Sequence, residues 1–142
     1  MTQTSQERYE ISSDPSRLDA ARIHDWLSTT YWAEGRTREH HDRAIAGSLN
    51  FGAYAVGSGE QVGYARVVTD SATFAWLCDV YVDPAARGHG LGVRLAGEAR
   101  DHLAAAGVRR LLLATDDAHG VYEKVGFRPL EQPDQWMSLR LA

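Results

Sequence analysis

The chain has 142 residues, of which 44% are hydrophobic, so it is long enough for one domain with an ordinary core. Its formal net charge of −4 gives no basic surface for nucleic acid, and no apolar stretch is long enough to act as a signal sequence or to cross a membrane. The single cysteine, Cys78, excludes an intramolecular disulfide. We therefore expect one cytoplasmic domain over residues 1–142, with residues 1–7 disordered.

The first half of the chain predicts a short strand and two helices. The strand is expected at residues 8–12. Asp14 and Pro15 are typical of a helix start, because aspartate caps the first turn and proline fits the first helical position, and this helix is expected to end near Ser28. After a loop at 29–36, a second helix is predicted from about residue 37 to residue 49.

The second half predicts alternating strands and helices. The longest apolar run, at 72–82, is expected in the centre of the sheet. The expected order of elements predicts a mixed α/β (α+β) sheet with helices packed on it. The predicted elements are hairpin strands at 51–57 and 61–68, a strand at 72–82, a helix from 91 to about 106, a strand at 108–115, a short helix at 118–124 and a final strand at 135–141.

Three glycines, Gly88, Gly90 and Gly92, lie between the central strand and the helix that follows it. The first N–H groups of a helix have no partner within the helix, and glycines allow a diphosphate to approach them closely. Arg87 adds a fixed cation beside them. A dinucleotide fingerprint is not matched, because valine or leucine stands where the third glycine is required, and the chain has no Gly-Lys-Ser/Thr triplet. The loop matches R-x-x-G-x-G.

Two motifs in the right order resemble the GNAT superfamily of acetyl-CoA-dependent N-acetyltransferases. "VDPAARGHGLG" at 82–92 is similar to V-x-P-x-x-R-G-x-G-x-G, and "AHGVYEKVGF" at 118–127 is similar to A-x-x-x-Y-E-K-x-G-F. The likeness covers roughly residues 50–141, and the front third agrees only in its order of elements. The resemblance implies a GNAT-type, mostly antiparallel sheet of six to seven strands with about four helices. It also implies direct acetyl transfer from acetyl-CoA to a primary amine, on a small molecule or a protein, in a ternary complex without a metal.

The resemblance implies that two segments of the chain bind the coenzyme. It also implies that Tyr122 is the general acid that protonates the departing thiolate. A phenol with a pKa near 10 can supply such a proton, and the alternative for Tyr122 is a half-buried aromatic with its hydroxyl at the surface. Thr115 stands where many relatives carry an asparagine. The contact that the asparagine amide would make with the coenzyme is therefore altered in this chain. The residues expected at the coenzyme are Val80, Tyr81, Val82, Arg87, Gly88, His89, Gly90, Leu91, Gly92, Thr115 and Tyr122.

Asp79 lies inside the apolar strand, where a carboxylate is costly to bury unless it is paired. It is a candidate general base or a holder of a substrate cation, and the alternative is a structural hydrogen-bond acceptor for a neighbouring loop. Tyr31 and Trp32 in the 29–36 loop, with Trp76, are candidate walls of the acceptor pocket; alternatively, Trp32 caps the core beneath its loop.

Three further expectations complete the sequence analysis. His40, His41 and Asp42 are expected on a solvated helix face rather than at a metal, since adjacent helical side chains diverge by about 100°. A homodimer is implied by the family resemblance alone. A non-catalytic acyl-CoA-binding regulatory module and an O-acyltransferase remain alternatives to the N-acetyltransferase.

Overall fold

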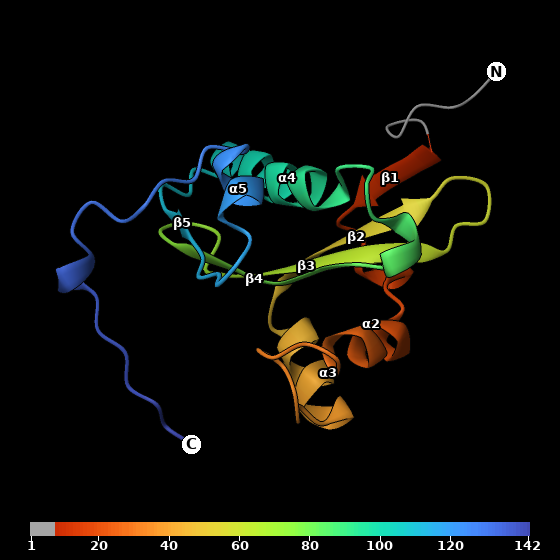
Figure 1. Ribbon diagram of the computed structural model, residues 1–142, viewed down its shortest axis with the longest axis horizontal. Helices are drawn as coiled ribbons and strands as arrows, with labels where there is room; N and C mark the ends of the chain where they lie inside the picture. Colours follow the sequence, from red (N-terminus) through yellow and green to blue (C-terminus); the bar gives the residue numbers. More distant parts are fainter. Residues whose placement is uncertain (1–7) are drawn as a thin grey trace.

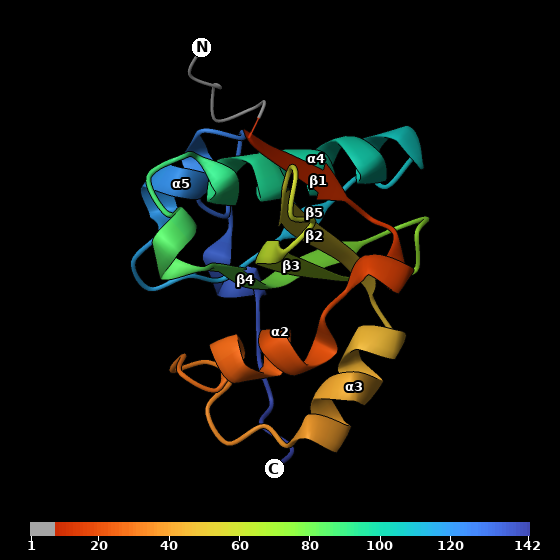
Figure 2. The ribbon, with the colours of Figure 1, turned by 90° about the vertical axis from the view of Figure 1, so that its right-hand side faces the viewer.

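The computed structural model describes residues 8–142, and the disorder expected of residues 1–7 lies outside this range. The described residues contain one five-stranded mixed sheet in the order β1-β2-β3-β4-β5 (Figures 1 and 2). Neighbouring strands run antiparallel except for the parallel pair β4–β5. The fold class is therefore as predicted, with five strands instead of six or seven. The strands are β1 Tyr9–Ser12, β2 Leu49–Ala55, β3 Gln61–Thr69, β4 Ala75–Val82 and β5 Leu111–Leu112.

Helices cover both faces of the sheet (Figures 1 and 2). The helices α4 (Leu91–Ala105) and α5 (His119–Glu123) lie on one face, and α2 (Ala20–Leu27) and α3 (Arg38–Ala46) lie on the other. Apolar side chains of α4 recur every four residues, so they form one stripe that packs against the sheet. This stripe consists of the buried residues Leu91, Leu95, Ala99 and Leu103. On the opposite face, Ile23, Trp26 and Leu27 of α2 pack around Tyr64 of β3.

The front helices differ from the prediction in their boundaries. The helix expected from Asp14 to Ser28 is split, because Leu18 is extended between the 3-10 turn Pro15–Arg17 and α2, and Asp19 caps α2 through the N–H of Arg22. The second helix ends at Ala46, and Leu49 already belongs to β2. The amide group of Asn50 donates hydrogen bonds to the carbonyls of Ile45 and Ser48, and these bonds stabilise the turn between α3 and β2.

The predicted central strand starts later than expected. The Asp70 carboxylate accepts hydrogen bonds from the N–H groups of Ala72 and Thr73, and this turn delays the start of β4 to Ala75. β4 lies between β3 and β5 rather than in the middle of the five strands.

The largest difference between the predicted and the observed fold lies in the C-terminal strands. The strand predicted at 108–115 pairs only over Leu111–Leu112. The final strand predicted at 135–141 is absent from the sheet, because the chain turns at Pro133–Gln135 and then leaves the body of the molecule (Figure 1).

Candidate active site

The strand β4 diverges from β5, so that among the described residues part of β4 has no neighbouring strand on the β5 side. The two strands pair only at Ala75–Leu111 and Trp76–Leu112, whereas β4 stays paired with β3 as far as Val82. An extra residue on β4 interrupts the β3 register, since Cys78 and Tyr81 face Arg66 and Tyr64. The divergence exposes an edge of backbone N–H and C=O groups along the second half of β4.

Asp79 lies in this bulge and has a left-handed backbone with φ of 53°. Its buried carboxylate accepts hydrogen bonds from two arginines: Oδ2 lies 2.7 Å from Arg36 Nη1 and 2.9 Å from Arg66 Nε. Burial alone would raise the pKa of Asp79, but the Arg36 hydrogen bond, together with the charge and hydrogen bond of Arg66, lowers it below its ordinary value. Asp79 is therefore a carboxylate at neutral pH, with both oxygens in contact with guanidinium groups.

The glycine loop supplies backbone N–H groups at the start of α4. Gly88 and Gly90 have φ of 86° and 71°, a conformation that glycine adopts without strain. In the described part of the chain, no hydrogen-bond acceptor is seen for the N–H groups of Gly88, Gly90 and Gly92. These three donors, at the positive end of a 15-residue helix, can bind an anion.

The other predicted coenzyme residues surround this loop. Arg87 Nε donates to the Val82 carbonyl at 3.0 Å, and its guanidinium carbon lies 5.4 Å from the ring centroid of Tyr81. Tyr81 also stacks on Trp26, and the His89 ring lies 5.4 Å from that of Tyr9. The side chain of Leu91 is buried, so Leu91 can offer a ligand only its backbone, whereas Val80 and Val82 are half-buried.

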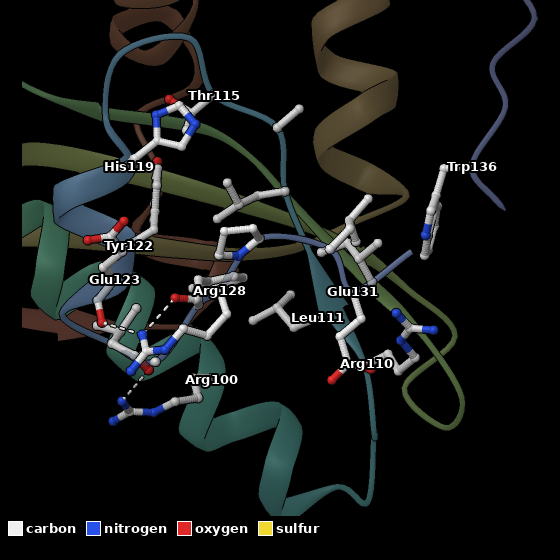
Figure 3. A pocket seen from close by; sticks show the side chains of 18 of the residues that line it. Arg100, Arg110, Leu111, Thr115, His119, Tyr122, Glu123, Arg128, Glu131 and Trp136 are labelled. Carbon is white, nitrogen blue, oxygen red and sulfur yellow. Dashed lines mark hydrogen bonds between the residues drawn. The ribbon is translucent and has the colours of Figure 1, made fainter. Parts of the chain in front are cut away.

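Tyr122 lies at one end of a large cavity beside β5 (Figure 3). The cavity has a volume of about 1150 Å³, and Thr115 and His119 line it beside Tyr122. Thr115 Oγ1 accepts the N–H of Ala118 at 3.1 Å, which supports the turn into α5. Burial, with smaller contributions from Asp117 and Tyr31, raises the pKa of Tyr122 to about 12. The phenol therefore keeps its proton throughout the neutral range.

The predicted acceptor residues are only partly brought together. Tyr31 and Trp32 are exposed and in edge-to-face contact with ring centroids 5.1 Å apart, and Tyr31 is close enough to influence the pKa of Tyr122. Trp32 lines a separate cavity of about 420 Å³ with Arg36 and His40. The core beneath this loop is filled by Ala33 instead of Trp32. Trp76 is half-buried on β4 at the point where β5 pairs with it.

Sequence reasoning missed three residues of this region. Arg36 and Arg66 are the partners of Asp79, and no local pattern connects a loop residue and a β3 residue with it. His41 is fully buried, 5.5 Å from the His24 ring, so the expectation of a solvated face was wrong for this residue. The signal was its helical spacing with Ile45, which places His41 on the inward face of α3.

The model of the acetyltransferase (GNAT) family matches residues 12–127. The chain belongs to the GNAT family of acetyltransferases. It is thus an acyltransferase. In the described residues, no group of three or more His, Cys, Asp or Glu side chains could hold a metal ion, and no helix is long and apolar enough to cross a membrane.

Solved and curated relatives agree with this membership. A candidate GNAT acetyltransferase from Xanthomonas campestris pv. campestris is 42% identical, with a TM-score of 0.86 over 94% of this chain and 93% of its own. A candidate acetyltransferase from Gibberella zeae is 29% identical over 94% of this chain and 87% of its own. Rv2747 from Mycobacterium tuberculosis, solved in complex with CoA, shares the fold at 20% identity, with a TM-score of 0.70 over 86% of this chain and 73% of its own.

Because Asp79 forms ion pairs with two arginines, we expect Asp79→Asn to lower the free energy of unfolding strongly. This change leaves two guanidinium groups without a counter-charge in a buried site, which costs about 3–5 kcal/mol of unfolding free energy. Because the folded-state pKa of Asp79 is lowered, its stabilisation is present above the unfolded pKa and is lost as pH falls through the folded value. Between neutral and acidic pH, the free energy of unfolding measured in urea should therefore depend less on pH for Asp79→Asn than for the unchanged chain.

The matched control is Asp42→Asn, which removes an exposed ion pair with Arg38 whose side chains are 48% and 49% exposed. Such a pair is worth about 0.5 kcal/mol or less. Equal unfolding free energies for the two variants would contradict the structural role of Asp79.

Proposed function

We propose that the protein is an N-acetyltransferase that moves an acetyl group from acetyl-CoA directly to a primary amine in a ternary complex. The observation that carries this proposal is one juxtaposition: the open N–H groups of the glycine loop follow the open edge of β4, with only the 3-10 turn Pro84–Ala86 between them. A long, flexible thioester with a diphosphate at one end needs both features. The acceptor is either a small molecule or a protein amino group.

The donor is assigned to backbone groups rather than to side chains. The diphosphate would accept hydrogen bonds from the N–H groups of residues 88–92, with Arg87 as the nearby cation. The amides of the pantetheine arm would pair with the β4 edge at Val80, Tyr81 and Val82, where no strand of the described residues competes for them and only the Val82 carbonyl is already taken, by Arg87 Nε. One N–H of this edge would stabilise the oxyanion; such a donor contributes about 3–4 kcal/mol in other acyl-transfer enzymes.

Tyr122 is the proposed proton donor. The amine nitrogen attacks the thioester carbon, the C–S bond of the tetrahedral intermediate breaks, and the thiolate takes the phenolic proton. The proton that the nitrogen loses passes to solvent water and from there restores the phenol. A donor with a pKa of about 12 stays protonated until charge develops on the sulfur, and the thiolate, whose thiol has a pKa near 8.5, is a weaker base than the phenolate. The hydrogen bond from Tyr122 to the developing thiolate is therefore the main contribution, and proton transfer completes as the coenzyme leaves.

The acceptor side is proposed to involve Tyr31, Trp32, Trp76 and Asp79. Asp79 could take the amine proton, or hold a cationic amine, only if one of its oxygens gives up an arginine hydrogen bond. Its contacts favour the structural alternative, in which Asp79 fixes Arg36 and hence the loop that carries Tyr31 and Trp32. On this account the amine meets the thioester between that loop and Tyr122.

Gly90→Ala should weaken coenzyme binding. A Cβ at this left-handed position strains the loop and moves N–H groups away from the diphosphate. Loss of one or two charge-assisted hydrogen bonds raises the Kd for CoA by about tenfold or more, which calorimetry measures. Gly59→Ala is the control, since Gly59 has a φ of 73° and equally open surroundings in the β2–β3 turn. Equal Kd values for the two variants would remove the loop from the coenzyme site.

Tyr122→Phe should lower kcat by about 100-fold or more while the Kd for CoA stays nearly unchanged, because only the proton donor is lost. Thiol release from acetyl-CoA, measured with a panel of primary amines, follows the rate. Tyr54→Phe is the matched control, since the buried Tyr54 hydroxyl has no hydrogen-bond partner among the described residues and lies outside the cavity. Unchanged turnover in Tyr122→Phe would exclude Tyr122 as the acid, and thiol release only with alcohols would indicate O-acylation.

A further inference from the structure

His41 on α3 is a fully buried side chain without a polar partner. The residue is 0% exposed, and neither Nδ1 nor Nε2 of its ring has a hydrogen-bond partner among the described residues. Burying an imidazole without a hydrogen bond costs free energy, and a leucine would fill a similar volume without that cost. A histidine at this position therefore calls for an explanation other than packing.

The ring of His41 packs against a second histidine, which binds the loop between α2 and α3. The two helices lie side by side on one face of the sheet (Figures 1 and 2), and the ring of His24 on α2 lies 5.5 Å from that of His41. His24 Nε2 lies 2.8 Å from the carbonyl oxygen of Arg36. Because a carbonyl only accepts hydrogen bonds, Nε2 carries a proton and is the donor. The contact with His41 therefore helps to fix the ring orientation in which this hydrogen bond forms.

Arg36 is the last residue of this loop, and both its backbone and its side chain are held. The carbonyl accepts the hydrogen bond of His24, and the guanidinium donates to the two carboxylate oxygens of Asp79 at 2.7 and 3.3 Å. The guanidinium thus ties the loop to β4, and the carbonyl ties it to α2. The loop that carries Tyr31 and Trp32 therefore ends at a residue whose backbone is positioned by His24.

The surroundings of His41 disfavour a positive charge on its ring. The groups that face it from the surrounding elements are Arg36 of the loop, His24 of α2, Asp79 of β4, Asp42 of α3 itself and, bound to Asp79, Arg66 of β3. Tyr64 of β3 also packs against this region, but burial raises the pKa of its hydroxyl, so it carries no charge. Burial, followed by the charges of Arg36 and His24, lowers the pKa of His41, and the two carboxylates offset this only in part.

A proton on His41 would open the packing between the two helices. The imidazolium would have two N–H donors without an acceptor, and it would lie close to the positive charge of Arg36. Because the pKa of His41 is lowered in the folded chain, the packing is fully stabilising above the ordinary value of 6.5 and loses this stability as pH falls through the folded value. Water reaches the buried ring only if α3 moves away from its neighbours, and this movement separates His41 from His24.

We propose that His24 and His41 are positioning residues for the acceptor side of the site. A neutral His41 holds the His24 ring against the Arg36 carbonyl, and a proton on His41 releases Arg36 and the loop that carries Tyr31 and Trp32. This inference rests on the proposed function, in which that loop receives the amine. Neither histidine touches the reacting atoms, and both act through Arg36. The acceptor loop is thus ordered at neutral pH and loosened in acid.

Kinetics test the positioning role through the KM for the amine. His24→Leu removes the hydrogen bond to Arg36 and should raise this KM about three- to tenfold, the contribution of one such bond. The kcat and the Kd for CoA should change less than about twofold, because the glycine loop and Tyr122 are untouched. His24→Gln should restore most of the affinity, since a glutamine amide also donates to a carbonyl. His102→Leu is the control, because His102 is exposed on α4, across the sheet. An unchanged KM in His24→Leu would overturn the inference and leave the proposed function intact.

A pH titration followed by NMR tests the same coupling in the unchanged chain and requires no acetyl transfer. Between neutral pH and about pH 4.5, the His41 ring should titrate below its ordinary value of 6.5, and the amides of residues 31–36 should shift with the same midpoint. His41→Leu should abolish this loop transition. Loop amides that do not follow His41, that stay fixed until the chain unfolds, or that keep the same midpoint in His41→Leu would overturn the proposal. A loop that follows His41 in a chain that transfers no acetyl group would preserve the coupling and contradict the proposed function.

Discussion

The ion pairs of Asp79 with Arg36 and Arg66 are the interaction on which the site depends. They hold a left-handed residue inside β4, where the bulge breaks the register with β3. The strand can then diverge from β5 after two paired residues and leave its edge open. The same carboxylate fixes Arg36, so the loop between α2 and α3 is positioned by the strand that it faces. One buried charge thus joins β4 to the loop between α2 and α3.

In the proposed function, the remaining parts of the site divide the chemistry between backbone and side chain. The glycine loop and the β4 edge offer N–H groups, which are fixed in place and carry no proton that must be exchanged. In the proposed function Tyr122 supplies the proton, and its burial would keep that proton in place until the sulfur becomes negative. On this proposal, binding by backbone and chemistry by one phenol place few demands on the sequence of the loop between α2 and α3.

The sequence was most informative where local stereochemistry decides the structure. Gly88 and Gly90 adopt positive φ angles that other residues avoid, and the four-residue spacing of Leu91, Leu95, Ala99 and Leu103 is typical of a helix with one buried face. The partners of Asp79 could not be predicted, because Arg36 and Arg66 lie 43 and 13 positions away and meet it only through the tertiary fold. The prediction of the final strand failed for a related reason. The alternation of apolar and polar residues at 137–141 predicts a strand but does not determine whether it joins an edge of this sheet.

Amide chemical shifts offer the most direct test of the central claim, that the open β4 edge and the glycine loop form one coenzyme site. CoA should be titrated into the ¹⁵N-labelled full chain while backbone resonances are followed. The account predicts saturable shifts with a common Kd at Gly88, Gly90 and Gly92 and at Val80 to Val82. Shifts confined to other regions, or no shifts at saturating CoA, would contradict it.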